Sequence, residues 1–240
     1  MLNTQQSDFG RGPAIWQAGG HGEEPLHFAA ANGFPVASYT PFLAHFQSDY
    51  HIIGLENRGV WDHQPPPRGF SWRQHADDLI AFLEHAQTRP VIAMGHSIGA
   101  TVSALADRQA FIDYHRNKAA YRRFSADAFN EYAQAGLIEQ ADGQYKLSYN
   151  REWEAHNFKH TFSPWQALRN IQVPTLVLRA EHSYLHKAKE FERRVKRLSP
   201  FVSHGVIKGA GHMALQEDCE QVVKLSRDWL QCTKLLRSET

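Results

Sequence analysis

The residues best suited to chemistry are a serine and a histidine, each set in a glycine-rich segment. Ser97 is the centre of Gly-His-Ser-Ile-Gly at positions 95–99, directly after an apolar run and before an alanine-rich stretch. Glycines two positions away suit a serine on a strained strand-to-helix turn, because larger side chains there would collide with neighbouring backbone. The serine is then exposed as a nucleophile, and the N–H of Ile98 can stabilise an oxyanion. The alternative is a structural serine on a glycine-rich turn.

A serine nucleophile needs a general base, and His212 in the segment Gly209–Met213 is the candidate. It follows the last predicted strand and precedes the final helix. The chain contains 15 histidines, so this assignment depends on position rather than on residue type. The backbone N–H of Phe34, in the loop Asn32–Pro35, is the candidate for a second oxyanion donor, the alternative being an ordinary glycine-proline turn. Together these groups could transfer an acyl group.

The elements that must position these residues are short apolar runs that alternate with helix-patterned stretches. This alternation predicts an α/β fold, with a mostly parallel sheet covered by helices on both faces. The predicted strands are Pro25–Ala29, His51–Leu55, Pro90–Met94, Pro174–Leu178 and Ser203–Ile207, and the helices are Trp72–His85 and Gln216–Leu235. Ligands bind beyond the carboxyl ends of the strands in such sheets, which is where the candidate residues lie.

Composition narrows the class of partner. The chain has 240 residues, 42% of them hydrophobic, which is enough for one large domain. Its 26 lysines and arginines nearly balance 25 acids, so no strong field favours nucleic acid or an anionic membrane. Two cysteines make no disulfide framework, and neither a signal peptide nor a membrane-spanning run is evident. We therefore expect a cytoplasmic protein that acts on a small, largely neutral molecule.

A stretch in which aromatic and charged residues are interleaved occupies positions 107–170. It has helical rather than strand-like patterning, and an insertion of this kind commonly covers a site with an aromatic wall. We predict a helical cap at 107–170 and an α/β core made of 1–106 and 171–240. The alternative is a helical subdomain whose aromatic side chains only pack together.

The sequence resembles the α/β-hydrolase fold family, and in particular bacterial members with an Asn-Gly-Phe-Pro loop. The likeness runs through the segments 32–35, 55–59, 77–79, 95–99, 174–180 and 209–213. It implies an eight-stranded sheet, a helical cap, no metal or other cofactor, and ester hydrolysis through an acyl-enzyme. The same scaffold also serves C–C bond and lactone hydrolysis. Ser97 argues against the dehalogenases and epoxide hydrolases, which use an aspartate nucleophile.

Two features depart from the family's pattern. The triad acid usually lies three residues beyond a glycine that here is Ala180, so Ser183 occupies its place. Glu181 is the nearest acid and our candidate for the third triad residue, with Asp113 as the alternative. The family's sixth strand is also missing after Ala106. The sequence could omit a segment, be a true deletion, or be completed by a homodimer that exchanges elements.

We therefore predict a serine hydrolase that cleaves a small or medium carboxylic ester. The alternative from another class is a catalytically silent binding protein with the same fold, which the absent carboxylate favours. Two histidine pairs at helical spacing, His156 with His160 and His182 with His186, lack the adjacent glutamate of a zinc protease motif, so we predict no metal site.

Overall fold

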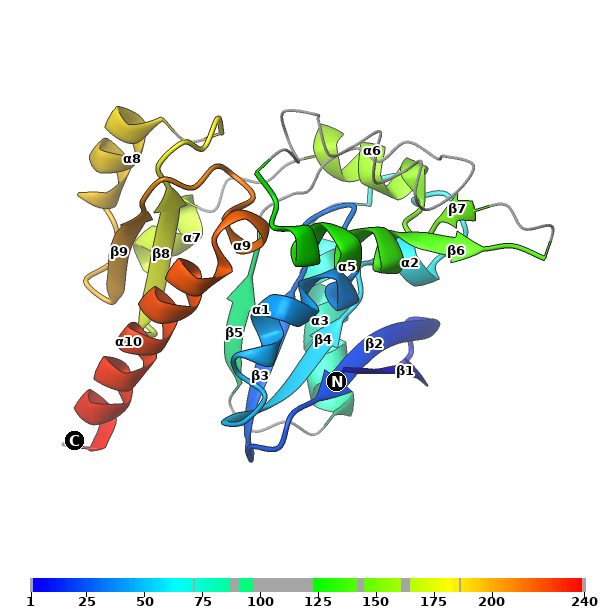
Figure 1. The fold of residues 1–240 in the computed structure, drawn as a ribbon, viewed down its shortest axis with the longest axis horizontal. Coiled ribbons are helices and arrows are strands. Elements are labelled where there is room, and N and C mark those ends of the chain that lie inside the picture. The colour runs from blue at the N-terminus through cyan, green and yellow to red at the C-terminus, as the bar shows by residue number, and fades with distance from the viewer. Residues whose placement is uncertain are drawn as a thin grey trace. The chain divides into compact units, whose positions relative to one another are not determined.

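The computed structural model describes residues 2–70, 72–86, 91–96, 123–141, 145–160, 165–185 and 187–238. The chain divides into a first unit, Met1–Thr161, and a second unit, Phe162–Thr240, and each is described by itself (Figure 1). Ser97, Ile98 and Asp113 lie outside the described residues, as does the segment after Ala106 where the sixth strand is expected to be missing.

A five-stranded mixed sheet forms the framework of the first unit, in the order β1-β2-β4-β3-β5. Its strands are β1 (Asn3–Asp8), β2 (Pro13–Gly19), β3 (Glu24–Ala29), β4 (Tyr50–Leu55) and β5 (Ile92–Gly95). β1 and β2 are antiparallel to their neighbours, whereas β3 is parallel to both β4 and β5. The three strands predicted in this part of the sequence are confirmed, each to within two residues at either end. β1 and β2 were not predicted.

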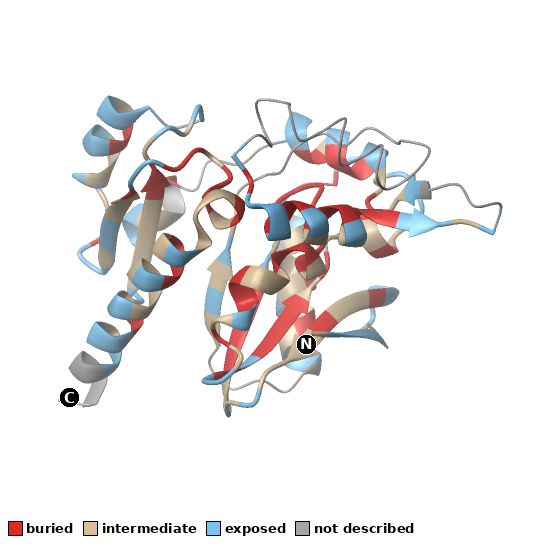
Figure 2. Ribbon diagram, in the orientation of Figure 1, coloured by how far each residue is buried: buried red, intermediate tan, exposed pale blue. Residues whose placement is uncertain are grey.

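Helices cover both faces of this sheet, and the alternation of side chains along β3 shows why. The helices concerned are η1 (Val36–Tyr39), α1 (Thr40–Ala44), α2 (Arg58–Trp61) and α3 (Trp72–His85). His27 faces Phe82 of α3, with 6.3 Å between ring centroids, while Phe28 faces Phe42 of α1 at 5.8 Å. Phe28 and Phe82 are fully buried, and each such side chain contributes about 1.5–3 kcal/mol to folding. Figure 2 shows β3 and β4 buried along most of their length.

The described part of the predicted cap contains two helices and a small hairpin within the first unit. These are α5 (Ala126–Gly136), β6 (Leu137–Glu139), β7 (Tyr145–Leu147) and α6 (Arg151–Lys159). Each helix begins at a side-chain cap: Ser125 Oγ accepts from the N–H of Ala128 at 3.1 Å, and Asn150 Oδ1 accepts from the N–H of Glu152 at 2.8 Å. The antiparallel pair β6 and β7 was not expected in a helical segment.

The second unit is built on a parallel pair of strands, β8 (Thr175–Ala180) and β9 (Val202–Ile207), both of which the sequence predicted. Its helices are α7 (Trp165–Asn170), α8 (Ala188–Val195), α9 (Ala214–Glu217) and α10 (Cys219–Ser238). Phe191, Ile207 and Leu230 are among its buried residues. Within the described ranges of both units, no helix is long and apolar enough to span a membrane.

Candidate active site

Three loops meet at one edge of the first sheet, because β3, β4 and β5 are parallel and end side by side. The loop after β3 carries Asn32 and Phe34, the loop after β4 begins at Glu56, and β5 is followed by His96. His96 is the last described residue before the candidate nucleophile. The arrangement is the strand-end location that the sequence predicts for a site.

The hydroxyl of Tyr39 joins the first of these loops to the third. The N–H of Ala31 donates to Tyr39 Oη at 3.2 Å, and Tyr39 Oη lies 2.9 Å from His96 Nδ1. The N–H of His96 also donates to the carbonyl oxygen of Ala29 at 3.0 Å. Both backbone and side chain therefore fix the residue that precedes Ser97.

The steric argument for glycine at position 95 is not supported by its described neighbours. A Cβ atom added to Gly95 would meet Ala29 at 3.5 Å, which is an ordinary van der Waals contact. Gly99, the other glycine of the motif, lies outside the described residues.

Phe34 is engaged on both its backbone and its ring. Its N–H, the predicted oxyanion donor, donates to the carbonyl oxygen of Ala31 at 3.1 Å across a turn in which Gly33 has φ +80°. Its fully buried ring, predicted to line a pocket, stacks on Tyr132 of α5 with centroids 4.5 Å apart. To bind an oxyanion, this N–H must either donate to the oxyanion and to the carbonyl oxygen of Ala31 together, or lose its hydrogen bond to Ala31.

Asn32 makes three hydrogen bonds, two to α6 and one to Tyr149, which precedes that helix. Its Oδ1 accepts from the hydroxyl of Tyr149 at 2.8 Å and from Nδ2 of Asn157 at 2.9 Å, and its Nδ2 donates to the carbonyl oxygen of Glu154 at 3.0 Å. Burial raises the pKa of Tyr149, so its hydroxyl remains protonated as a donor. Sequence reasoning missed this role, although the Asn-Gly-Phe-Pro motif drew attention to the position.

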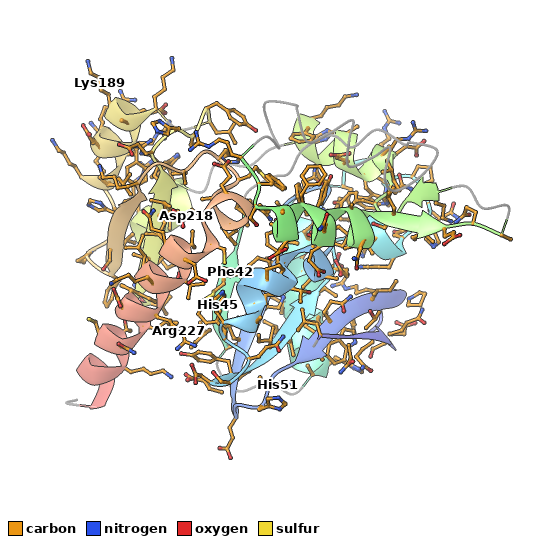
Figure 3. The ribbon with its side chains drawn as sticks, in the orientation of Figure 1. Phe42, His45, His51, Lys189, Asp218 and Arg227 are labelled. Carbon is orange, nitrogen blue, oxygen red and sulfur yellow. The ribbon has the colours of Figure 1, made fainter. Side chains whose placement is uncertain are left out.

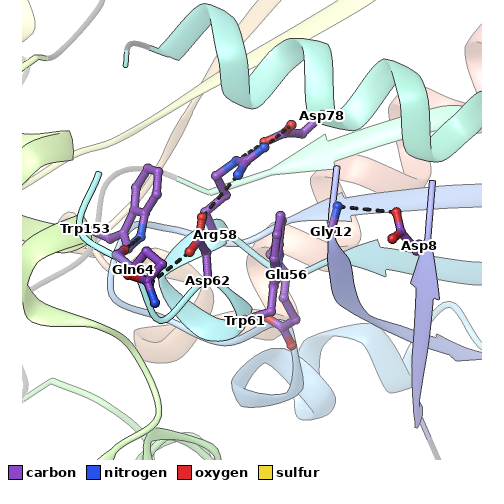
Figure 4. Close-up of polar contacts among 9 residues, drawn as sticks. All are labelled: Asp8, Gly12, Glu56, Arg58, Trp61, Asp62, Gln64, Asp78 and Trp153. Atoms are coloured by element: carbon purple, nitrogen blue, oxygen red, sulfur yellow. Dashed lines mark hydrogen bonds and ion pairs between the residues drawn. The ribbon is translucent and has the colours of Figure 1, made fainter. Parts of the chain in front are cut away.

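Glu56 supports the loop from the side of β4. Its carboxylate accepts from the N–H of Val36 at 2.8 Å and from Nε2 of Gln17 at 3.2 Å, and its carbonyl oxygen accepts from Nε1 of Trp61 at 3.0 Å (Figure 4). Burial raises the pKa of this carboxyl group to about 7. Glu56 therefore anchors the beginning of η1, two residues after Phe34.

Arg58 and Asp78 form a bidentate ion pair in the first unit. Nε and Nη2 of Arg58 bind the two carboxylate oxygens of Asp78 at 2.6 and 2.8 Å, while Nη1 contacts Asp62 at 3.2 Å (Figure 4). Paired, in-plane hydrogen bonds of this kind fix geometry as well as charge. The motif residues at 58 and 78 thus join the β4 loop to α3 and are structural.

In the second unit, the candidate base His212 is bound by a serine. Ser183 Oγ lies 3.1 Å from His212 Nδ1, and the same oxygen accepts from the N–H of Leu185 at 3.3 Å. The ring of Tyr184 lies 5.2 Å from the imidazole, centroid to centroid. Ser183 stands where the family's spacing places the triad acid. The same spacing could have identified Ser183 as the residue that contacts His212.

Glu181, the predicted triad acid, instead contacts the backbone of the histidine loop. Its carboxylate accepts from the N–H of Gly209 at 2.8 Å and lies 3.6 Å from Nζ of Lys208. The hydrogen bond from Gly209 is the main cause of the lowered pKa of Glu181. A role for Glu181 as the triad acid stays a prediction.

The histidine loop is held at a second point by Glu217. The N–H of Gly211 donates to Glu217 Oε2 at 2.6 Å, and a Cβ atom at position 211 would lie 2.6 Å from Oε1. Only glycine fits there without displacing the carboxylate. The loop that leads to the candidate base is thus held at Gly209 and at Gly211.

The histidine pair on α6 packs ring to ring. His156 and His160 stack with centroids 4.1 Å apart, and His156 Nε2 donates to the carbonyl oxygen of Phe70 at 2.7 Å.

Comparison with known proteins identifies the family to which this chain is similar. A sequence profile of the alpha/beta hydrolase family matches residues 18–225. No curated protein sequence matches the chain significantly.

Three solved structures illustrate how far the likeness extends. E-2-(acetamidomethylene)succinate hydrolase is 17% identical and has a TM-score of 0.81, over 96% of this chain and 100% of that one. An alpha/beta hydrolase from Novosphingobium aromaticivorans is 15% identical with a TM-score of 0.72, over 95% and 98%. Naproxen esterase (carboxylesterase NP) from Bacillus subtilis is 15% identical with a TM-score of 0.68, over 96% and 92%. The predicted alpha/beta hydrolase fold is confirmed, with a mixed sheet and helices on both faces.

Proposed function

This chain belongs to the alpha/beta hydrolase family, and from that premise we propose that it is a serine hydrolase of small or medium carboxylic esters. Ser97 is the nucleophile and His212 the general base, while the N–H groups of Phe34 and Ile98 bind the oxyanion. The observation that carries the proposal is the contact of 3.1 Å between Ser183 Oγ and His212 Nδ1. A partner on Nδ1 holds the imidazole in the tautomer and orientation in which Nε2 acts as a base.

The reaction proceeds through an acyl-enzyme. Ser97 Oγ attacks the ester carbonyl carbon while its proton passes to His212 Nε2, and the carbonyl oxygen becomes an oxyanion. The C–O bond then breaks, the alcohol leaves with the proton from His212, and the acyl group remains on Ser97. A water molecule, deprotonated by Nε2, attacks this acyl group; the bond between Ser97 Oγ and the acyl carbon then breaks, Oγ takes the proton back from His212, and the carboxylic acid is released.

Ser183 is a positioning residue in this mechanism. The mechanism requires the tautomer in which His212 Nδ1–H donates to Ser183 Oγ, the oxygen that also accepts from the N–H of Leu185. A hydroxyl orients the imidazole but does not neutralise the imidazolium that forms, so we expect slower catalysis than a carboxylate would give. Glu181→Gln tests the other assignment, because glutamine keeps an acceptor for the N–H of Gly209 while removing the charge. A strong loss of turnover in that variant would support Glu181 as the triad acid.

We assign the core to 1–106 and 171–240 and the cap to 107–170. Two contacts support a cap that lies against the oxyanion loop: the stacking of Tyr132 on Phe34, and the hydrogen bonds from Tyr149 and Asn157 to Asn32. On this assignment, substrate contacts the segment that also holds the loop in place.

A fluorophosphonate probe tests the nucleophile directly. We expect the wild-type chain to be labelled and Ser97→Ala to remain unlabelled. Ser203→Ala, which alters an exposed serine on β9, is the matched control and should label like the wild type. Labelling that does not depend on Ser97 would refute the assignment. A panel of aryl esters and lactones then distinguishes an esterase from a lactone hydrolase.

A second candidate is a binding protein of the same fold that does not turn over its ligand. The neutral hydroxyl of Ser183 beside His212, where the family places an acid, is the observation that favours it. Binding of an aryl ester without release of its alcohol, in a chain that the probe does not label, would support this candidate.

A further inference from the structure

The second unit contains a cavity of about 160 Å³ between α7 and α8 that the ester chemistry does not use. Its lining consists of Trp165, Arg169, Arg193, Arg194, Arg197 and Leu198. Four of these six residues are arginines. We propose that this cavity binds the phosphate group of a small molecule.

The lining carries more positive charge than its neighbours neutralise. Arg194 donates through Nε and Nη2 to Oε1 of Glu190, at 2.8 and 2.6 Å. Among the described residues, the side chains of Arg193 and Arg197 have no bonded partner, and Arg169 is bonded to a backbone carbonyl group. Arg169, Arg193 and Arg197, which are all exposed, are therefore the three arginines of the lining without a bonded carboxylate among the described residues.

Two of the four guanidinium groups are held in place without a ligand. Arg194 lies over the ring of Trp165, 5.1 Å from its centroid, and is fixed from its other side by Glu190. Arg169 Nε donates to the carbonyl oxygen of Trp165 at 3.2 Å. Trp165 itself is only 7% exposed and so is a rigid support. Side chains that are already ordered lose less entropy when they bind an anion.

Guanidinium groups and a small cavity together define the class of ligand. The planar donors of arginine match the oxygens of a phosphate group, often in pairs. Pockets that enclose a whole small molecule measure roughly 300–1,000 Å³, so this one suits a single anionic group with the rest of the molecule outside. A phosphate monoester carries a charge of about −1.5 to −2 at neutral pH. That charge matches the uncompensated arginines better than the single charge of a carboxylate does.

The test is a titration of the full chain followed by NMR, at constant ionic strength. Inorganic phosphate and glycerol phosphate are the probes, and the indole N–H of Trp165 and the Nε–H of Arg194 are the signals. We expect saturable shifts of both signals, and an affinity at least about tenfold weaker in Arg193→Ala/Arg197→Ala. Tighter binding of glycerol phosphate would identify an organic phosphate as the ligand, and equal binding would identify the free anion. Either result supports the site.

A charge-matched control separates the cavity from general electrostatic attraction. Lys189→Ala/Lys196→Ala removes two charges from the same helix and the residue after it. Neither lysine lines the cavity, and Lys189 projects outward from α8 (Figure 3). We expect an affinity within about threefold of the wild type. An equal loss in both double variants, acetate binding as tight as phosphate, or no shift at about 10 mM phosphate would overturn the proposal.

Discussion

Ser183→Asp would place a carboxylate beside the Nδ1 atom that the serine hydroxyl now contacts at 3.1 Å. Unit charges about 4 Å apart attract by about 1 kcal/mol in water and about 4 kcal/mol near a protein surface. Ser183 and His212 are both partly exposed, which favours the lower part of this range. We take an attraction of about 1.4 kcal/mol between the carboxylate and the imidazolium, which corresponds to about a tenfold change in rate and a pKa shift of about one unit.

The direction of the expected shift in the pH profile follows from the charge of the imidazole. A carboxylate favours protonated His212, so the acid limb of kcat/KM against pH should move upward by about one unit. The plateau should rise about tenfold, because the imidazolium of the transition state is also stabilised. Ser183→Ala should lower the plateau by at least about tenfold, since the ring loses its partner.

The assay is hydrolysis of p-nitrophenyl acetate between about pH 5 and about pH 9, with Ser203→Ala as the control. Suppose that Ser97→Ala abolishes turnover while Ser183→Asp leaves both the limb and the plateau unchanged. The pairing of Ser183 with the base would then be refuted and the hydrolase proposal would survive. Turnover that persists in Ser97→Ala would instead refute the hydrolase proposal.

Three further predictions concern the loops. Tyr39→Phe removes the hydroxyl that lies 2.9 Å from His96 and should lower the free energy of unfolding by about 1–3 kcal/mol; an unchanged urea midpoint would contradict this. Burial raises the pKa of Glu56 to about 7, so the folded chain binds the extra proton and stability should fall as pH rises from about 4.5 to about 7. Glu56→Gln should remove up to about 3 kcal/mol of that fall in urea titrations at both pH values. Gly211→Ala, whose methyl group would lie 2.6 Å from Glu217, should cost about 1–3 kcal/mol and slow ester hydrolysis; normal activity and stability would show that the loop adapts.

The buried strands could be predicted because their apolar runs reflect burial within a covered sheet. β1 could not, since Asn3–Asp8 is almost wholly exposed and polar, and it is held by backbone pairing with β2 that no side-chain pattern records. The strands of the β6 and β7 hairpin are three residues long, which is too short for alternation to be distinguished from helical spacing.

The candidate site, too, could be predicted only in part. Chain order and loop position drew attention to Phe34 and His212, but not to the partners of either loop. Spacing along the sequence placed Ser183 at the position of the family's triad acid. Its contact with His212, however, depends on the pairing of β8 with β9, in which Ala180 lies opposite Ile207. Separation along the chain also hid the three partners of Asn32, which are 117, 122 and 125 residues away.

Those partners of Asn32 link the conformation of its loop to the position of α6. A motion that carries α6 off the loop would break the hydrogen bonds of Asn32 to Asn157 and to the carbonyl group of Glu154, and would leave a buried amide to be hydrated. On the proposed function, a substrate that contacts α6 would therefore also act on the loop that carries the N–H of Phe34, which couples substrate recognition to the proposed oxyanion site.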